Sequence, residues 1–420
     1  MVKLVVVADD FTGALDTGIK FAEAGAQTQV MLKPDFGTEE IRPDSEVLIV
    51  DAETRHLDGE AAYHIVYDLV RRCKNYGIKY FYKKTDSALR GNVGSELSAV
   101  SDAAGCSVSF VPALPKLNRI TKDGIQYIDG VPVADSLFGK DPFEPVTKSA
   151  VAEVIHEGTG IEVVVVKNCK QIKRAERRAI YVYDAKSNLE MENIARELKD
   201  TLGLEATAGC AGFADCLTKV IDFSHKREAE IRRVKNLLIV CGSVNEITKR
   251  QIKYAEKAGF RRISLNVVQK LQPGYFETEE ARRFLNDFYR KCSQGMPVIM
   301  DVFSHDDAVE EAAAYGRLVG VAEENIRECI VNRLGEFIDL WLGFGVDGAL
   351  SLSGGDTVYA FLQRKGCKDI RPVCEIMPGA VLFETKVGER AMQVVSKSGG
   401  FGNESIFVEI ADKMMVGGVV

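Results

Sequence analysis

The sequence lacks the patterns by which membrane-spanning, zinc-binding and P-loop proteins are usually recognised. No stretch of about 18 uncharged apolar residues occurs, so no segment is expected to span a membrane. None of the 10 cysteines forms a CxxC pair and the 5 histidines are scattered, which argues against a metal site. The phosphate-binding motif GxxxxGK(S/T) is absent. Because the apolar run at residues 4–7 is too short for a signal peptide, we expect a cytoplasmic protein with free thiols.

An excess of positive charge is also absent. The 54 lysines and arginines are outnumbered by 61 aspartates and glutamates, which gives a net charge of −7 at pH 7. This balance argues against nucleic acid or an anionic membrane as the main partner, whereas a small anionic substrate needs only a local group of cations. The sequence does not set the oligomeric state, and a homodimer is one of the options it leaves open.

Short β-branched runs alternate with helical patterns along the whole chain, which is typical of the α/β class. The densely charged segment 225–236 indicates a boundary between two domains, at residues 1–230 and 231–420, each with a mostly parallel sheet flanked by helices. Residues 114–145 hold four prolines and little periodicity, and we expect a long loop there of the kind that is often functional. Helices are expected at residues 17–24, 61–75, 95–104, 191–202, 246–257, 278–291 and 306–319.

Two carboxylates follow the first buried strand, where Asp9 and Asp10 come directly after the run of valines. In an open α/β sheet, ligands bind beyond the carboxyl ends of the strands. A carboxylate at that place can bond sugar hydroxyls or act as a general base. We expect Thr12 to cap the next helix and Gly13 to allow a close approach. The alternative is that Asp9 or Asp10 only caps the helix.

A group of mixed charge follows a later strand, within the segment KKTDSALRGN at residues 83–92. Lys84, Asp86 and Arg90 lie there, just before an expected helix, and cations beside a helix N-terminus form an anion site. Arginine can hold a carboxylate through two hydrogen bonds, which lysine cannot imitate. Arg55, soon after another strand end, is a further candidate. The alternative for this group is a surface cluster of salt bridges.

Three loops rich in glycine or serine follow strands in the second half of the chain. Such loops present backbone N–H groups and a helix N-terminus to phosphate, so together they predict a nucleotide site, although each alone can be a structural turn. The aspartate among them can lie near a phosphate-bound Mg²⁺ or can cap its own helix. The candidate residues are Ser243, Gly354, Gly355, Asp356, Thr357, Gly399 and Gly400.

The chain resembles the four-carbon acid sugar kinase family in a set of motifs that occur in the same order from residue 4 to about residue 408: ADDFTGALDTG, KKTDSALRGNVGSEL, PALPKLNR, CGSVN, LSGGDT and SKSGGFG. The resemblance implies an amino-terminal domain that binds the sugar acid and a carboxyl-terminal domain that binds the nucleotide. It also implies phosphorylation of the 4-hydroxyl of a tetronate, such as D-threonate, D-erythronate or 3-oxo-tetronate, by ATP with Mg²⁺. Closure between the domains is expected to exclude water.

The resemblance also implies roles for particular residues. The loop residues Ser243, 354–357 and one glycine of 399–400 would contact ATP. The tetronate carboxylate is expected to pair with Arg90, with Arg55 or Lys84 as further partners, and its hydroxyls with Asp9, Asp10 or Asp86. We favour Asp10 over Asp86 as the base.

The sequence departs from the family pattern at two positions. Asn118 stands where the family usually has glycine, and Ala88 where it often has threonine. Neither change touches a charged group, but both can alter substrate choice. Two alternatives to the tetronate kinase stay open: a kinase for another short sugar acid, and a ligand sensor that has kept the fold but lost phosphoryl transfer.

Overall fold

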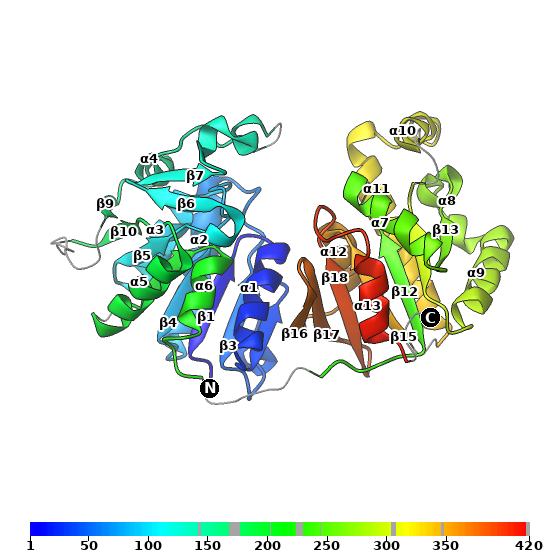
Figure 1. The fold of residues 1–420 in the computed structure, drawn as a ribbon, viewed down its shortest axis with the longest axis horizontal. Helices are drawn as coiled ribbons and strands as arrows, with labels where there is room; N and C mark the ends of the chain where they lie inside the picture. The colour runs from blue at the N-terminus through cyan, green and yellow to red at the C-terminus, as the bar shows by residue number, and fades with distance from the viewer. Residues whose placement is uncertain are drawn as a thin grey trace. The chain divides into compact units, whose positions relative to one another are not determined.

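Each half of the chain folds around its own sheet with helices packed against it (Figure 1). The computed structural model describes residues 1–141, 144–167, 177–201, 203–223, 230–243, 245–303, 308–345 and 348–416. The chain divides into unit 1, residues 1–228, and unit 2, residues 229–420. The charged segment 225–236, where the sequence predicts the domain boundary, lies partly outside the described residues. The predicted α/β class is confirmed.

The sheet of unit 1 is parallel throughout, because every neighbouring pair of its strands runs in the same direction. Ala8 at the end of β1 lies opposite Asp51 of β3 and opposite Lys84 of β4, so the carboxyl ends of these strands are level. The strand order is β2 (Thr28–Met31), β3 (Val47–Asp51), β1 (Leu4–Ala8), β4 (Tyr80–Lys84), β11 (Ala206–Gly209), β5 (Val108–Val111), β10 (Ala179–Tyr183) and β9 (Glu162–Val166).

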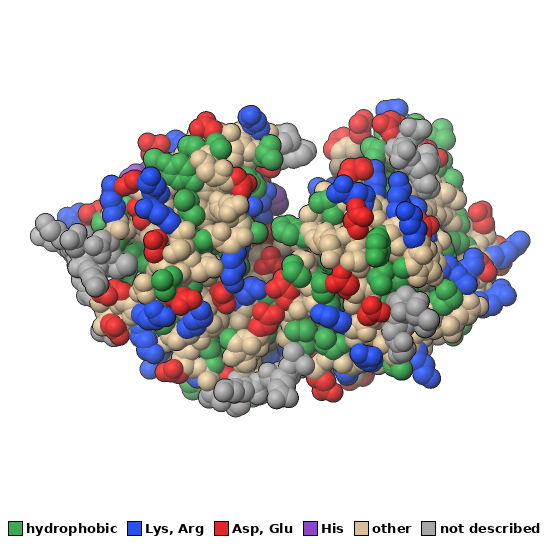
Figure 2. Space-filling model, in the orientation of Figure 1, with side chains coloured by type: hydrophobic (Ala, Val, Ile, Leu, Met, Phe, Trp, Pro, Cys, Tyr) green, Lys and Arg blue, Asp and Glu red, His purple; other side chains and the backbone are tan. Residues whose placement is uncertain are grey.

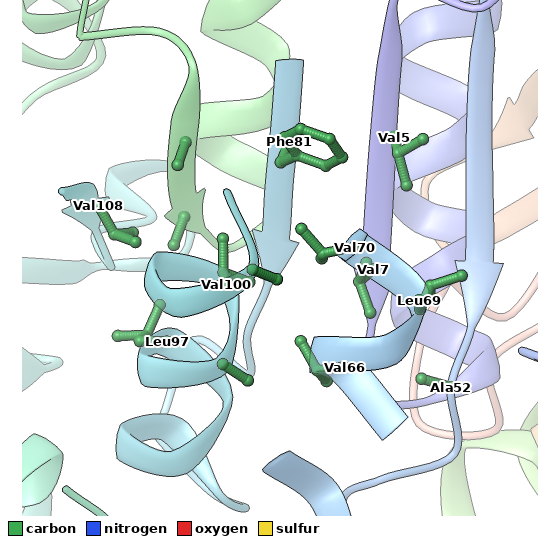
Figure 3. Close-up of a cluster of buried hydrophobic side chains, with 14 of the residues drawn as sticks. Val5, Val7, Ala52, Val66, Leu69, Val70, Phe81, Leu97, Val100 and Val108 are labelled. Carbon is green, nitrogen blue, oxygen red and sulfur yellow. The ribbon is translucent and has the colours of Figure 1, made fainter. Parts of the chain in front are cut away.

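Helices cover both faces of this sheet, since successive side chains of a strand point to opposite faces and both sets are buried. One group of helices that touch one another is α1 (Phe11–Glu23), α5 (Asn188–Asp200) and α6 (Ala211–Leu217); the other is α2 (Gly59–Asn75), α3 (Val93–Ala104) and α4 (Val151–His156). Figure 3 shows the core beneath the second group of helices. There, strand residues Val5, Val7 and Phe81 meet helix residues Val66, Leu69, Val70, Leu97 and Val100.

The prediction of a long loop at residues 114–145 is wrong for much of this segment. The segment contains an antiparallel sheet of β6 (Arg119–Lys122), β7 (Ile125–Ile128) and β8 (Val131–Pro132), and the short 3-10 helices Pro115–Leu117, Val133–Asp135 and Leu137–Lys140. Two Asp-Gly pairs, Asp123–Gly124 and Asp129–Gly130, have positive φ at both residues. Such pairs form the two-residue turns that join antiparallel strands, and they are the sequence signal for this small sheet.

Unit 2 has a mixed sheet. Its strands β13 (Arg261–Ser264), β14 (Val298–Asp301), β12 (Asn236–Cys241), β15 (Gly348–Ser353) and β18 (Arg390–Lys397) are parallel, and β17 (Ala380–Val387) and β16 (Asp369–Met377) continue the sheet antiparallel. Its helices are α7 (Glu246–Lys257), α8 (Val267–Leu271), α9 (Glu279–Cys292), α10 (Ala308–Leu318), α11 (Ile326–Gly343), α12 (Gly355–Arg364) and α13 (Ile406–Met414). The sequence predictions omitted β16, β17, α8, α11 and α13.

Charged side chains of both signs are interspersed over the visible face of each unit (Figure 2). Within the part of the chain that the structure describes, no helix combines the length and the apolar character needed to cross a membrane.

Replacing Leu97 of α3 by alanine should lower the free energy of unfolding by about 3 kcal/mol, because the side chain is fully buried and its removal leaves a cavity. Urea unfolding followed by circular dichroism measures the change. Leu189→Ala in α5 is the matched control, because that side chain is 63% exposed and its loss should change the stability by less than about 0.5 kcal/mol. Equal effects of the two substitutions would contradict the described core.

Candidate active site

The level carboxyl ends of β1, β3 and β4 bring charged side chains from separate parts of unit 1 together. The last residue of β4 and the loops that follow these three strands carry all the candidate residues that the sequence predicts in the first half of the chain. These residues are Asp9 and Asp10 after β1, Arg55 after β3, and Lys84, Asp86 and Arg90 at and after the end of β4.

Arg55 joins the two aspartates that follow β1. Its Nε donates to Oδ2 of Asp9 at 2.8 Å, and its Nη1 donates to Oδ2 of Asp10 at 2.7 Å. The backbone N–H groups of Thr54 and Arg55 donate to the carbonyl of Asp9, at 3.1 and 3.2 Å, which fixes the two loops to each other. Burial opposes the charge of Arg55, but Asp9 and Asp10 outweigh it and raise the pKa of the guanidinium above its usual value.

Asp10 is the N-cap of α1, because its Oδ1 accepts a hydrogen bond from the backbone of Gly13 at 2.9 Å. The predicted cap at Thr12 is therefore wrong, since the helix already begins at Phe11. The cap uses one oxygen of Asp10 and Arg55 binds the other. A Cβ atom at residue 13 would lie 2.6 Å from Nζ of Lys84 and 2.5 Å from Oδ1 of Asp10, so a side chain there would displace one of these groups.

Lys84 lies among three carboxylates. Its side chain is buried, which alone would lower the pKa of the ammonium, but the charges of Asp9, Asp10 and Asp86 raise it above its usual value. The ammonium is therefore charged at neutral pH. Burial alone would likewise raise the pKa of Asp9, but the neighbouring cations, Lys83 first, lower it below its usual value.

Asp86 holds Arg90 in a two-pronged ion pair. Nε of Arg90 donates to Oδ2 of Asp86 at 3.0 Å, and Nη2 donates to Oδ1 at 3.2 Å. Burial would raise the pKa of Asp86, but the hydrogen bonds and charge of Arg90 hold it well below the usual range, with help from Arg55 and Lys84. The fork of Arg90, which we expected to bind substrate, is thus directed at a carboxylate of the protein.

A second buried ion pair lies next to these loops and was not predicted. Nζ of Lys83 is 3.2 Å from Oε2 of Glu96 and donates to the carbonyl of Lys84 at 2.8 Å. The hydroxyl of Thr54 donates to the other carboxylate oxygen of Glu96. Because Thr54 precedes Arg55 and Lys84 ends β4, this network holds two of the site loops. Two consecutive lysines at the end of an otherwise apolar strand are the signal that could have revealed it.

The small antiparallel sheet contributes a further cation that sequence reasoning did not assign. Arg119 of β6 donates from Nη1 to the hydroxyl of Ser87 in the loop after β4. The ring of Phe138 lies 5.0 Å from the guanidinium of Arg119 and 5.4 Å from that of Arg90. Asn118, which departs from the family pattern, has a φ of +53°. Glycine and asparagine both tolerate this backbone, so the departure preserves the local conformation.

Unit 2 has a cavity of about 720 Å³ at the carboxyl ends of its parallel strands, a size ordinary for small-molecule sites. The predicted residues Ser243, Gly354, Gly355, Asp356, Thr357 and Gly399 line it. Gly400 is not among its lining residues. The remaining wall is largely apolar and includes Val302, Phe303, Ala308, Ala312, Ile326, Ile330 and Val331.

The glycine loops of unit 2 approach one another closely. A Cβ atom at Gly399 would lie 2.4 Å from the hydroxyl oxygen of Ser243, and Thr248 donates to the carbonyl of Gly399 at 2.8 Å. Gly354, with a φ of +110°, is the N-cap of α12, so the alternative role of Asp356 as the cap is wrong. Asp356 instead accepts a hydrogen bond from Nε of Arg327 at 2.9 Å.

The side chain of Lys397 holds the backbone of the third of these loops, the one that contains Gly399. Its Nζ donates to the carbonyls of Ser398 and Gly399 at 2.8 and 3.3 Å. Burial lowers its pKa to about 8. Among the described residues, no group of three or more His, Cys, Asp or Glu side chains is placed to hold a metal ion.

Comparison with known proteins decides the family. The family model described as the sugar-binding N-terminal domain matches residues 4–217, and the one described as the nucleotide-binding C-terminal domain matches residues 238–407. The chain belongs to the four-carbon acid sugar kinase family. The resemblance stated from the sequence motifs is thereby confirmed.

Relatives in this family match over nearly their whole length. The D-threonate kinase of Salmonella typhimurium is 26% identical, over 96% of this chain and 96% of the relative. The D-erythronate kinase of Heliobacterium modesticaldum is also 26% identical, over 99% and 98%. The crystal structure of the Haemophilus influenzae protein HI1011 gives a TM-score of 0.78 at 20% identity, over 96% of this chain and 98% of that chain, which shows a shared fold.

In this member of the four-carbon acid sugar kinase family, Lys397 should make the stability of unit 2 depend on pH. Below about pH 8 its ammonium is charged in both states, and burying it opposes folding. Between about pH 8 and the ordinary value of 10.5 the folded state has lost the proton that the unfolded state keeps, so the free energy of unfolding should rise with pH. Urea unfolding of the natural chain and of Lys397→Met measures this difference. A difference that stays constant with pH would contradict the assignment.

Proposed function

We propose that the protein is an ATP-dependent kinase that phosphorylates the terminal 4-hydroxyl of a four-carbon sugar acid, D-threonate or D-erythronate. We assign the sugar acid to residues 1–230 and the nucleotide to residues 231–420. The observation that carries the proposal is the paired group of buried carboxylates and cations at the strand ends of unit 1, in a chain whose full-length relatives are named D-threonate and D-erythronate kinases.

Asp10 is the base in this proposal. A base must be within reach of the hydroxyl whose proton it accepts. Asp10 is the most accessible of the three aspartates, with a side chain that is 24% exposed against 2% for Asp9 and 11% for Asp86.

The other charged groups would position the substrate and neutralise charge. Phosphoryl transfer depends on positioning and on cations near the transferred group more than on covalent chemistry. Lys84, charged and beside Asp10, is suited to face the incoming phosphoryl oxygens. Asp9 and Asp86 still have lone pairs with which they can accept hydrogen bonds from sugar hydroxyls.

The unit 2 cavity has walls that suit both the base and the phosphates of a nucleotide. Its apolar wall can cover a flat base, and the backbone at the N-terminus of α12 can bind phosphate oxygens. Mg²⁺ would arrive with ATP and screen the phosphate charge. Asp356 and Glu323 line the cavity and offer the hard oxygen ligands that this ion prefers.

A coupled assay of ADP release with a panel of sugar acids tests the proposal. Turnover with D-threonate or D-erythronate is the expected result. Turnover only with three- or five-carbon acids would show that the protein is a kinase for a different class of sugar acid. Tight binding of a tetronate without ADP release under any condition would favour the ligand sensor instead.

Asp10→Asn should lower kcat by about 100-fold or more, because the amide cannot accept the proton of the hydroxyl. The KM for ATP should change little. The matched variant Asp86→Asn frees Arg90 and should act mainly on the KM for the sugar acid. A near-normal kcat for Asp10→Asn, with a strong loss of kcat in Asp86→Asn, would move the role of base to Asp86.

A further inference from the structure

The arginines that the sequence predicts as partners of the substrate carboxylate already have carboxylate partners in the protein. Nε and Nη1 of Arg55 bind Asp9 and Asp10, and Nε and Nη2 of Arg90 bind Asp86. A substrate carboxylate would have to displace a short, charge-assisted hydrogen bond to reach either fork. Neither arginine therefore offers a free two-pronged site.

Arg119 is different. Within the part of the chain that the structure describes, no carboxylate oxygen lies within 4.0 Å of its guanidinium, and its Nη1 donates only to the neutral hydroxyl of Ser87. Its Nε is buried and has no hydrogen-bond partner. Because Nε is enclosed and Nη1 is used by Ser87, Nη2 is the donor of this guanidinium that a ligand can reach. A guanidinium without a carboxylate partner beside these strand ends therefore indicates a place for an anion.

The surroundings hold this guanidinium at the site. Ser87, its partner, directly follows Asp86 in the loop after β4, and Gln126 of β7 donates to the carbonyl of Ser87 at 3.0 Å. Phe138 lies against the guanidiniums of both Arg119 and Arg90, at 5.0 and 5.4 Å from its ring centre. The aromatic ring fixes the orientation of Arg119, and among the described residues its Nη2 has no hydrogen-bond partner.

We propose that Arg119 binds the carboxylate of the sugar acid and thereby makes the enzyme select an acid over the corresponding neutral polyol. This inference rests on the proposed function and adds the residue that sets the substrate class. Nη2, the terminal nitrogen that Ser87 does not use, donates to an oxygen of the substrate carboxylate in a charge-assisted hydrogen bond. Arg90 then positions Asp86 instead of holding substrate.

The test compares an acid with a neutral analogue of the same chain. In Arg119→Ala, kcat/KM for D-erythronate or D-threonate should fall by about 100-fold, in line with the loss of a charge-assisted hydrogen bond and of the cation itself. The kcat/KM for erythritol or threitol, which carry a CH₂OH group in place of the carboxylate, should change by less than about threefold. The KM for ATP should stay unchanged, which also shows that the variant is folded.

Two further variants sharpen the result. Arg119→Lys keeps the charge but cannot bond Ser87 and the substrate with the geometry of a guanidinium, so it should recover only part of the activity toward the acid. Lys116→Ala is the matched control, because it removes a cation from the same segment. The side chain of Lys116 is 63% exposed and forms an ion pair with Asp215. The ratio of acid to polyol activity should be that of the natural chain in this control.

The outcomes separate this inference from the proposed function. An equal loss toward acid and polyol in Arg119→Ala, or a selective loss of the acid in Arg90→Ala alone, would overturn the role of Arg119 while the kinase stands. If the natural chain releases no ADP with any tetronate, the proposed function fails, and calorimetric titration with D-erythronate then tests Arg119 by itself. Binding by the natural chain that is lost in Arg119→Ala supports the assignment; absence of binding by the natural chain overturns it.

Discussion

At the carboxyl edge of the unit 1 sheet, Asp9 and Asp86 can be buried as ions only because each has a cation beside it. An isolated ion in a protein interior is strongly destabilising, and breaking a buried pair leaves an uncompensated charge. Asp9 with Arg55 and Asp86 with Arg90 meet this constraint at 2.8 and 3.0 Å. The same pairing keeps both aspartates ionised, so the site presents hydrogen-bond acceptors to a polyol at neutral pH.

The fold supplies the alignment that this pairing needs. Three parallel strands end at the same level, so side chains far apart in the sequence meet without a long loop. Gly13 gives Lys84 room beside the cap of α1, and the network of Lys83, Glu96 and Thr54 holds the neighbouring backbone. In unit 2 the same edge of a parallel sheet carries the loops that line the cavity we assign to the nucleotide.

The α/β class and the gathering of charged residues could be predicted from the sequence, because buried parallel strands read as apolar runs and their ends must lie together. The individual contacts could not. Whether Arg90 meets Asp86 or a ligand depends on side-chain geometry within one loop. Helix α11 was missed because Gly335 interrupts its pattern, although that glycine lies against the carbonyl of Ala360 in the packed structure. The β16–β17 hairpin was missed because prolines interrupt its pattern. The sheet that carries Arg119 was missed because the two Asp-Gly pairs were not interpreted as turns.

A crystal structure with ADP and D-erythronate bound tests the central claim most directly. The account predicts the nucleotide in the unit 2 cavity, with its phosphates on the loop from Gly354 to Thr357. It predicts the sugar acid at the strand ends of unit 1, with its carboxylate on Arg119 and its terminal hydroxyl within hydrogen-bond distance of Asp10. A nucleotide bound at the strand ends of unit 1, or a sugar acid that touches neither Arg119 nor Asp10, would contradict it.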